Sequence, residues 1–141
     1  MPGINHQSWL PYGRQTITQE DEEHVMRCLR SDYLTQGPIL PEFEQRIAAA
    51  CQAPYAVAFN SATSALHAAC LALGLSPGDY LWTSPVSFVA SSNCALYCGA
   101  SVDFVDIEPS TGLISISSLK TRLAEAEKNG TLPKVLVPVH L

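Results

Sequence analysis

Short apolar runs alternate with helical segments along most of this chain, and no other feature of the sequence limits its fold as strongly. Four runs have the length and composition of buried strands: residues 55–59, 80–83, 101–105 and 135–139. Helical patterns occur before and between them, at about 41–52, 62–73, 88–98 and 118–128. Strands that are apolar almost throughout are typical of parallel sheets with helices on both faces. The sequence therefore predicts an α/β fold with a mostly parallel sheet covered by helices.

The first forty residues follow a different pattern. Residues 1–17 are rich in turn formers and predict no regular element. Thr18 and the acidic residues just after it predict the start of a helix, because a hydroxyl cap and negative charge both stabilise a first turn. Two prolines and a glycine interrupt the segment 31–41, which we expect to be a loop.

Charge and composition exclude several classes of function. Eight basic residues against thirteen acidic ones give a net charge of −5 without any basic cluster, so binding to nucleic acid or anionic membranes is not expected. No apolar run approaches the roughly 20 residues of a membrane span, and the N-terminus lacks the pattern of a secretory signal. The five cysteines are odd in number and form no C-x-x-C pair, which favours reduced thiols and a cytoplasmic protein.

The junction Asn60–Leu66 carries the clearest chemical signal. It joins the predicted strand 55–59 to an alanine-rich helix, and it consists of small and hydroxyl residues. A helix that starts there offers free backbone N–H groups and its positive dipole end at the edge of the sheet, which suits a phosphate. The plainer interpretation is that the hydroxyl groups only cap the helix.

Several segments, taken in order, resemble the amino-terminal part of the DegT/DnrJ/EryC1/StrS sugar aminotransferases, which are pyridoxal-phosphate enzymes of fold type I. The matching segments are Tyr12, 34–38, 60–66, 78–79, 84–90, 99–100, 105–107 and 138–140. The resemblance extends over essentially the whole chain, and the sequences of its motifs are most similar to those of the pseudaminic-acid branch. It implies that residues 1–40 form an arm, a helix and a substrate loop. Residues 41–141 would then be the first, incomplete part of the large domain that binds pyridoxal 5'-phosphate.

The resemblance also implies roles for individual residues in cofactor binding. Ala62, Thr63 and Ser64 match the turn that holds the cofactor phosphate through backbone N–H groups and hydroxyls. Phe88 matches the aromatic position that stacks on the pyridine ring. Without the resemblance, helix capping would be the preferred role of the first three residues, and core packing that of Phe88.

For the substrate, the resemblance points to the N-terminal region. Tyr12 and the loop residues Asp32, Tyr33, Leu34 and Thr35 match segments that contact the nucleotide-sugar in the pseudaminic-acid branch. That branch transfers an amino group from glutamate to C4 of a UDP-linked 4-keto-6-deoxy-N-acetylhexosamine. The family further implies a homodimer whose active sites lie at the subunit interface. The alternative roles are a surface ring for Tyr12 and a simple connector for the loop.

The catalytic groups of the family are not found in this sequence. The family's lysine, which holds the cofactor covalently, and the acid beside the pyridine nitrogen both follow the Pro-Val-His strand, beyond Leu141. Lys120, Lys128 and Lys134 do not match the position of that lysine. The sequence also stops directly after its last predicted strand, so we interpret it as a fragment and expect no transaminase activity from it alone. No metal site is expected, since Cys94 and Cys98 have no further ligands at suitable spacing.

Three other interpretations stay open at this point. The chain could be a non-catalytic fold type I fragment that serves as a binding or structural module. Within the family it could belong to another nucleotide-sugar aminotransferase or to a sugar dehydratase that has histidine in place of the lysine. A dehydrogenase-type nucleotide enzyme is disfavoured, because no G-x-G-x-x-G sequence follows a predicted strand.

Overall fold

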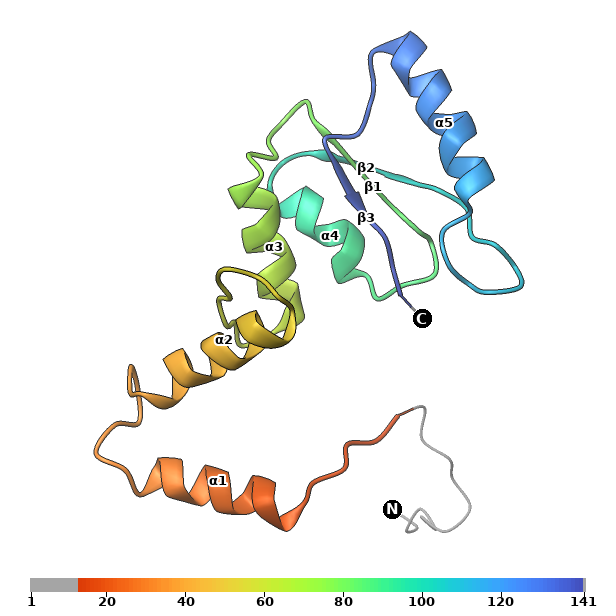
Figure 1. Ribbon diagram of the computed structural model, residues 1–141. Coiled ribbons are helices and arrows are strands. Elements are labelled where there is room, and N and C mark those ends of the chain that lie inside the picture. The colour runs from red at the N-terminus through yellow and green to blue at the C-terminus, as the bar shows by residue number, and fades with distance from the viewer. Residues whose placement is uncertain (1–12, 141) are drawn as a thin grey trace, which may run out of the picture. The chain divides into compact units, whose positions relative to one another are not determined.

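The computed structural model describes residues 13–140 and divides the chain into two compact units, Met1–Val57 and Ala58–Leu141 (Figure 1). The first unit contains two helices and the second contains a sheet with three helices. The domain boundary near residue 40 that the family resemblance implies remains a prediction. Among the described residues, no helix is long and apolar enough to cross a membrane.

Helix α1 (Gln19–Leu29) of the first unit begins where the sequence predicts it. The Thr18 backbone N–H donates to Asp21 Oδ2 at 2.8 Å, and the Asp21 N–H donates back to Thr18 Oγ1 at 3.3 Å. This reciprocal pair forms a capping box that satisfies two N–H groups of the helix start. The backbone N–H of Thr18 is also the main reason why the pKa of the Asp21 carboxyl lies below its usual value.

Helix α2 (Ile39–Ala50) begins two residues earlier than the sequence predicts. Pro38 occupies the cap position and Pro41 lies within the first turn. A first-turn residue has no intrahelical partner for its N–H, so a proline there costs the helix no hydrogen bond. The pair of prolines therefore belongs to the start of the helix and not to the loop before it.

The second unit is built on three parallel strands in the order β2-β1-β3. The strands are β1 (Tyr80–Thr83), β2 (Ser101–Phe104) and β3 (Val135–Val137). The helices are α3 (Ala62–Ala72), α4 (Ala90–Tyr97) and α5 (Ile116–Asn129). Both neighbours of the central strand β1 pair with it in parallel, which confirms the predicted sheet type.

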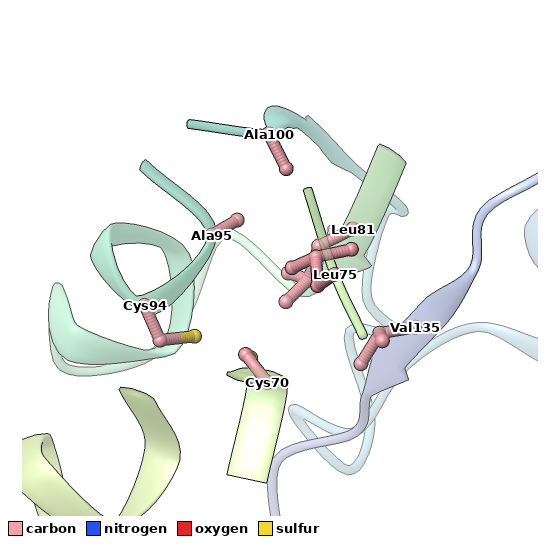
Figure 2. Close-up of a cluster of buried hydrophobic side chains, with 7 residues drawn as sticks. All are labelled: Cys70, Leu75, Leu81, Cys94, Ala95, Ala100 and Val135. Atoms are coloured by element: carbon pink, nitrogen blue, oxygen red, sulfur yellow. The ribbon is translucent and has the colours of Figure 1, made fainter. Parts of the chain in front are cut away.

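Helices cover both faces of this sheet. Successive residues of β1 point to opposite sides, so they pack against different helices. Leu81, which is fully buried, packs with Cys70 of α3 and Cys94 of α4 in the cluster of Figure 2. Trp82 points the other way and packs with Ala126 of α5. Figure 1 shows the same arrangement, with α3 and α4 on one side of the strands and α5 on the other. The expected α/β architecture is therefore present.

One predicted strand does not form. Residues 55–59 have no regular secondary structure, and Tyr55 and Val57 are 85% and 72% exposed. An apolar run becomes a strand only where a neighbouring strand accepts its hydrogen bonds, and in the described sheet β1 pairs with β2 and β3 alone. The prediction of a strand at residues 55–59 is therefore wrong, because an apolar run does not by itself determine which strand it pairs with.

Candidate functional site

Helix α3 lies beside α4 on one side of the sheet and runs opposite to the strands (Figure 1). Its eleven residues are about 16 Å long, slightly longer than the four-residue strand β1 at about 13 Å. Its last turn lies beside the amino ends of the strands, because Lys134, which precedes β3, donates from Nζ to the Gly74 carbonyl at 2.7 Å. The amino end of α3 therefore lies at the carboxyl edge of the sheet, where ligands bind in open α/β folds.

The first turn of α3 contains both satisfied and open donors. Ser61 caps the helix, and its Oγ accepts the backbone N–H of Ser64 at 3.2 Å. The hydroxyl of Ser64 donates to Asn60 Oδ1 at 3.2 Å and also lies 2.9 Å from Ser61 Oγ. In the described part of the chain, the N–H groups of Ala62 and Thr63 and the Thr63 hydroxyl have no partner.

These open donors fit a phosphate group. Two backbone N–H groups and a hydroxyl at the positive end of a helix match the oxygen acceptors and the negative charge of a phosphate monoester. Ala62 is exposed and Thr63 is half-buried, so the approach is open. Ser64 differs, because both its hydroxyl and its N–H already serve the cap. Of the three residues that the sequence proposed for the phosphate, Ala62 and Thr63 thus have the better geometry.

Phe88 lies at the same edge of the sheet, five residues after the end of β1 and just before α4. Its side chain is 74% exposed. Phe88 therefore does not pack in the core of the second unit, which was its alternative role. An exposed aromatic ring offers a flat apolar face for a planar ligand.

The predicted substrate loop belongs to the first unit, so no geometry relates it to Thr63 or Phe88. Ser31 organises this loop, since its Oγ donates to the Cys28 carbonyl at 2.8 Å. Tyr33 and Leu34 are 61% and 69% exposed, and Asp32 and Thr35 are exposed as well. The loop therefore offers its side chains freely within its own unit. Tyr12 lies outside the described residues.

Gly37 closes the loop against Tyr33. A Cβ atom at Gly37 would lie 2.7 Å from the Cβ of Tyr33, which is too close for any side chain to be accepted without a shift. The loop can return towards α2 along this path only because residue 37 has no side chain.

Other reactive residues of the second unit have structural roles. Lys134 donates to Asp79 Oδ2 at 2.9 Å in addition to the Gly74 carbonyl, so its ammonium group is engaged at the amino edge. His67 of α3 packs edge-on against Tyr97 of α4, with ring centroids 5.3 Å apart.

The cysteines between α3 and α4 also have a packing role. Burial raises the pKa of the Cys70 thiol to about 12, with a further contribution from the adjacent Cys94. Figure 2 shows the two side chains facing each other inside the apolar cluster. Thiols that stay protonated are poor metal ligands. No group of three potential metal ligands is found among residues 13–140.

Two polar features were missed by sequence reasoning. Thr83 and Ser84 are each 1% exposed, and the Thr83 hydroxyl donates to the Val137 carbonyl at 2.9 Å. On the opposite face, Arg122 of α5 pairs with Asp103 and lies 5.2 Å from the Trp82 ring centroid. The signal for Thr83 was a hydroxyl residue at the end of an apolar strand. The Arg122 contact joins residues nineteen positions apart and left no local signal.

Comparison with known proteins identifies the family of this chain. The model of the DegT/DnrJ/EryC1/StrS aminotransferase family matches residues 15–141. The spore coat polysaccharide biosynthesis protein SpsC of Bacillus subtilis (strain 168) is 38% identical over 96% of this chain and 33% of its own length. The UDP-4-amino-4,6-dideoxy-N-acetyl-beta-L-altrosamine transaminase of Campylobacter jejuni subsp. jejuni serotype O:2 is 38% identical over 85% of the chain and 31% of its own length.

A solved structure gives the same result for the fold. The apo form of the putative sugar aminotransferase Spr1654 from Streptococcus pneumoniae has a TM-score of 0.79 at 30% identity, over 94% of this chain and 32% of Spr1654. Its PLP form has a TM-score of 0.73 at 31% identity, over 79% of this chain and 29% of Spr1654. The chain spans about a third of the length of these relatives. By sequence and by fold, the chain belongs to the DegT/DnrJ/EryC1/StrS aminotransferase family.

Proposed function

We propose that this chain provides the phosphate-binding and ring-stacking part of a pyridoxal-phosphate site in a sugar aminotransferase. The observation that carries the proposal is the carboxyl edge of the sheet, where the open donors at the start of α3 and the exposed ring of Phe88 occur together. The family match and the PLP form of Spr1654 support it.

In this proposal each residue has a limited task. The N–H groups of Ala62 and Thr63 and the Thr63 hydroxyl donate hydrogen bonds to the phosphate, and the dipole of α3 stabilises its charge. Ser64 fixes the shape of this turn through the cap with Ser61. Phe88 covers one face of the pyridine ring and so holds its plane. When bound, pyridoxal phosphate supplies the carbonyl that accepts and passes on an amino group and the ring that withdraws electrons during the transfer.

We infer that none of the three lysines of this chain carries the cofactor. Lys134 is engaged with Asp79 and the Gly74 carbonyl at the amino edge, which is opposite to the phosphate site. Lys120 and Lys128 belong to α5, which covers the other face of the sheet from α3 and α4. The covalent lysine and the acid beside the ring nitrogen would therefore come from sequence outside this chain, and the chain alone would be inactive as a transaminase.

For the substrate we propose a UDP-linked 4-keto-6-deoxy-N-acetylhexosamine that receives its amino group at C4 from glutamate. Tyr12 and the loop Asp32–Thr35 would contact the nucleotide-sugar. The Campylobacter transaminase supports this choice at 38% identity. SpsC is equally similar, and the GDP-perosamine synthase of Caulobacter vibrioides is 31% identical, so other nucleotide-sugars are the direct competitors. We further propose a cytoplasmic homodimer.

The decisive experiment uses protein expressed from its complete reading frame. Added pyridoxal phosphate should give the long-wavelength absorbance of protein-bound cofactor, and glutamate should bleach it. The UDP-linked keto-sugar should then restore the absorbance and yield an amino-sugar detectable by mass spectrometry.

Other outcomes of this experiment would indicate a different function. Restoration by a GDP-linked keto-sugar alone would move the proposal to another nucleotide. Bound cofactor that a different amino acid bleaches would change the proposed donor, and cofactor that binds without a covalent bond to the protein would favour a dehydratase of the same family. Failure to bind the cofactor at all would contradict the proposed function and leave a non-catalytic module.

A further inference from the structure

Thr83 is an unusual residue for the position it occupies. It ends the central strand β1, its side chain is 1% exposed, and the strand is otherwise apolar. Valine has almost the same shape and would fill such a position without a polar group. A buried hydroxyl costs free energy unless it is hydrogen-bonded, and here the hydroxyl donates to the Val137 carbonyl at 2.9 Å.

This bond joins two strand ends that are far apart in the sequence. Thr83 and Val137 are register partners and are both the last residues of their strands. Pro138 follows directly and has no backbone N–H, so it cannot extend the ladder. The Thr83 hydroxyl therefore adds a side-chain bond at the point where the backbone pairing of β1 with β3 stops.

The hydroxyl also lies on the face of the sheet that carries the candidate cofactor site. Thr83 shares its face with Leu81, because residues two apart in a strand point to the same side. Leu81 packs in the cluster of Figure 2, which includes Cys70 of α3 and Cys94 of α4. The Thr83 bond thus lies on the same face of the sheet as α3 and α4.

A second buried hydroxyl follows Thr83 directly in the chain. Ser84 is equally buried, and its Oγ lies 3.4 Å from the Val86 carbonyl, to which it donates a weak bond. The turn 84–87 then leads to Phe88, while Pro138–His140 leave the other strand. The Thr83 hydroxyl therefore adds one side-chain bond between the ends of β1 and β3, from which these two segments leave the sheet.

We infer that Thr83 is a positioning residue of the cofactor site, which acts by fixing the segment that carries Phe88 against the end of β3. This inference rests on the proposed function, since it assumes that Phe88 stacks on the cofactor ring. Thr83 itself touches no ligand. Loss of the Thr83 hydroxyl should affect the binding and orientation of the cofactor ring more than it affects the stability of the fold.

The test compares Thr83→Val with Thr83→Ser in protein expressed from its complete reading frame. Valine removes the hydroxyl and keeps the shape, whereas serine keeps the hydroxyl. We expect Thr83→Val to raise the dissociation constant of pyridoxal phosphate by up to about tenfold, the upper limit set by the free energy of one buried hydrogen bond. At saturating cofactor it should also reduce the circular dichroism in the cofactor's visible band, which reports how firmly the ring is held. Thr83→Ser should restore both values.

The outcomes separate this inference from the proposed function. A wild-type protein that binds no pyridoxal phosphate contradicts the proposed function. If the wild type binds and Thr83→Val has the same affinity and dichroism, the inference alone is overturned. A lower urea midpoint with unchanged cofactor parameters would show a purely structural role, and this also overturns it.

A second measurement needs no variant and therefore holds even if Thr83→Val fails to fold. Cofactor binding to the wild type should slow hydrogen exchange at residues 86–88 and at Val139–His140 together. Slower exchange in only one of the two segments would contradict a link through Thr83.

Discussion

The two edges of the sheet differ in how their polar groups are satisfied. At the amino edge, Lys134 donates to Asp79 and to the Gly74 carbonyl, and Asp79 Oδ2 accepts the Ser76 backbone N–H at 2.9 Å. At the carboxyl edge, the Ala62 and Thr63 N–H groups have no partner among the described residues, and Phe88 is exposed. The first edge stabilises the fold by itself, whereas the second keeps donors and an aromatic face available for a ligand.

The largest expected effect comes from a change that weakens both edges at once. Leu81→Ala removes a fully buried side chain from the centre of the cluster between the sheet and α3 and α4. Loss of the packed methyl groups and the resulting cavity should lower the free energy of unfolding by roughly 2–5 kcal/mol, measured by urea denaturation. The matched control is Leu136→Ala in β3, where the side chain is 39% exposed. Equal losses in the two variants would contradict the placement of the core.

The carboxyl edge alone should respond to Thr63→Val. This change removes a hydroxyl that is free in the described structure and leaves the side-chain shape almost intact. A hydrogen bond to a charged group contributes about 1.5–3 kcal/mol, so the affinity for pyridoxal phosphate should fall roughly 10–100-fold while the urea midpoint changes little.

Two variants control for the Thr63 result. Thr63→Ser keeps the hydroxyl and should retain the cofactor. Thr121→Val makes the same change in α5, where the hydroxyl donates to the Ser117 carbonyl at 3.1 Å, and it should leave the affinity unaltered. If Thr63→Val binds the cofactor as the wild type does, Thr63 has no place in the phosphate site.

The amino edge should give the opposite result in Asp79→Asn, which should lower stability and leave cofactor affinity unchanged. Hydrogen bonds from Lys134 and then from the Ser76 hydroxyl lower the pKa of Asp79 below its ordinary value of 3.8. A carboxyl with a lowered native pKa stabilises the fold above the unfolded-state pKa, and this stabilisation is lost as the pH falls through the native value.

The stability difference between wild type and Asp79→Asn should therefore be largest near neutral pH and shrink below about pH 3.8. Asp21, whose pKa is also lowered, is present in both proteins, so its contribution cancels in the comparison. Urea midpoints measured across this pH range provide the check. A difference that stays constant with pH would mean that the Asp79–Lys134 contact does not stabilise the folded chain.

The smallest effect is expected from a substitution in the first unit, away from both edges of the sheet. Gly37→Ala would place a Cβ atom 2.7 Å from the Cβ of Tyr33 and so displace the loop of the first unit. If this loop binds the nucleotide-sugar, the Michaelis constant for the sugar should rise modestly, while cofactor affinity stays at the wild-type value. Unchanged kinetics in Gly37→Ala would count against the loop as a substrate site.

Much of the second unit could be predicted from local sequence alone. The start of α3 after Asn60 and the parallel strands β1, β2 and β3 depend on capping residues and on continuous apolar runs, which are local signals. Residues 55–59 carried the same apolar signal but form no strand, because pairing depends on a partner that the run itself does not encode. Local patterns therefore predicted which segments are apolar better than they predicted which segments pair.

The candidate site shows the same limit. The sequence proposed Thr63 and Ser64 as equals, but only the structure shows that the Ser64 hydroxyl is taken by Asn60. The exposure of Phe88 and the bond from Thr83 to Val137 depend on where distant segments lie, and no spacing rule gives them. Residue types could be assigned from the sequence, whereas the free or occupied state of each donor needed the fold.

The proposed phosphate site is tested most directly at the open donors of α3. Protein expressed from its complete reading frame, with ¹⁵N-labelled alanine and threonine, would be titrated with pyridoxal phosphate while the amide signals are recorded. A phosphate bound at this turn should give large shifts for Ala62 and Thr63, and both shifts should be smaller when pyridoxal replaces its phosphate ester. Binding of the cofactor without a shift at either amide would contradict the proposed phosphate site.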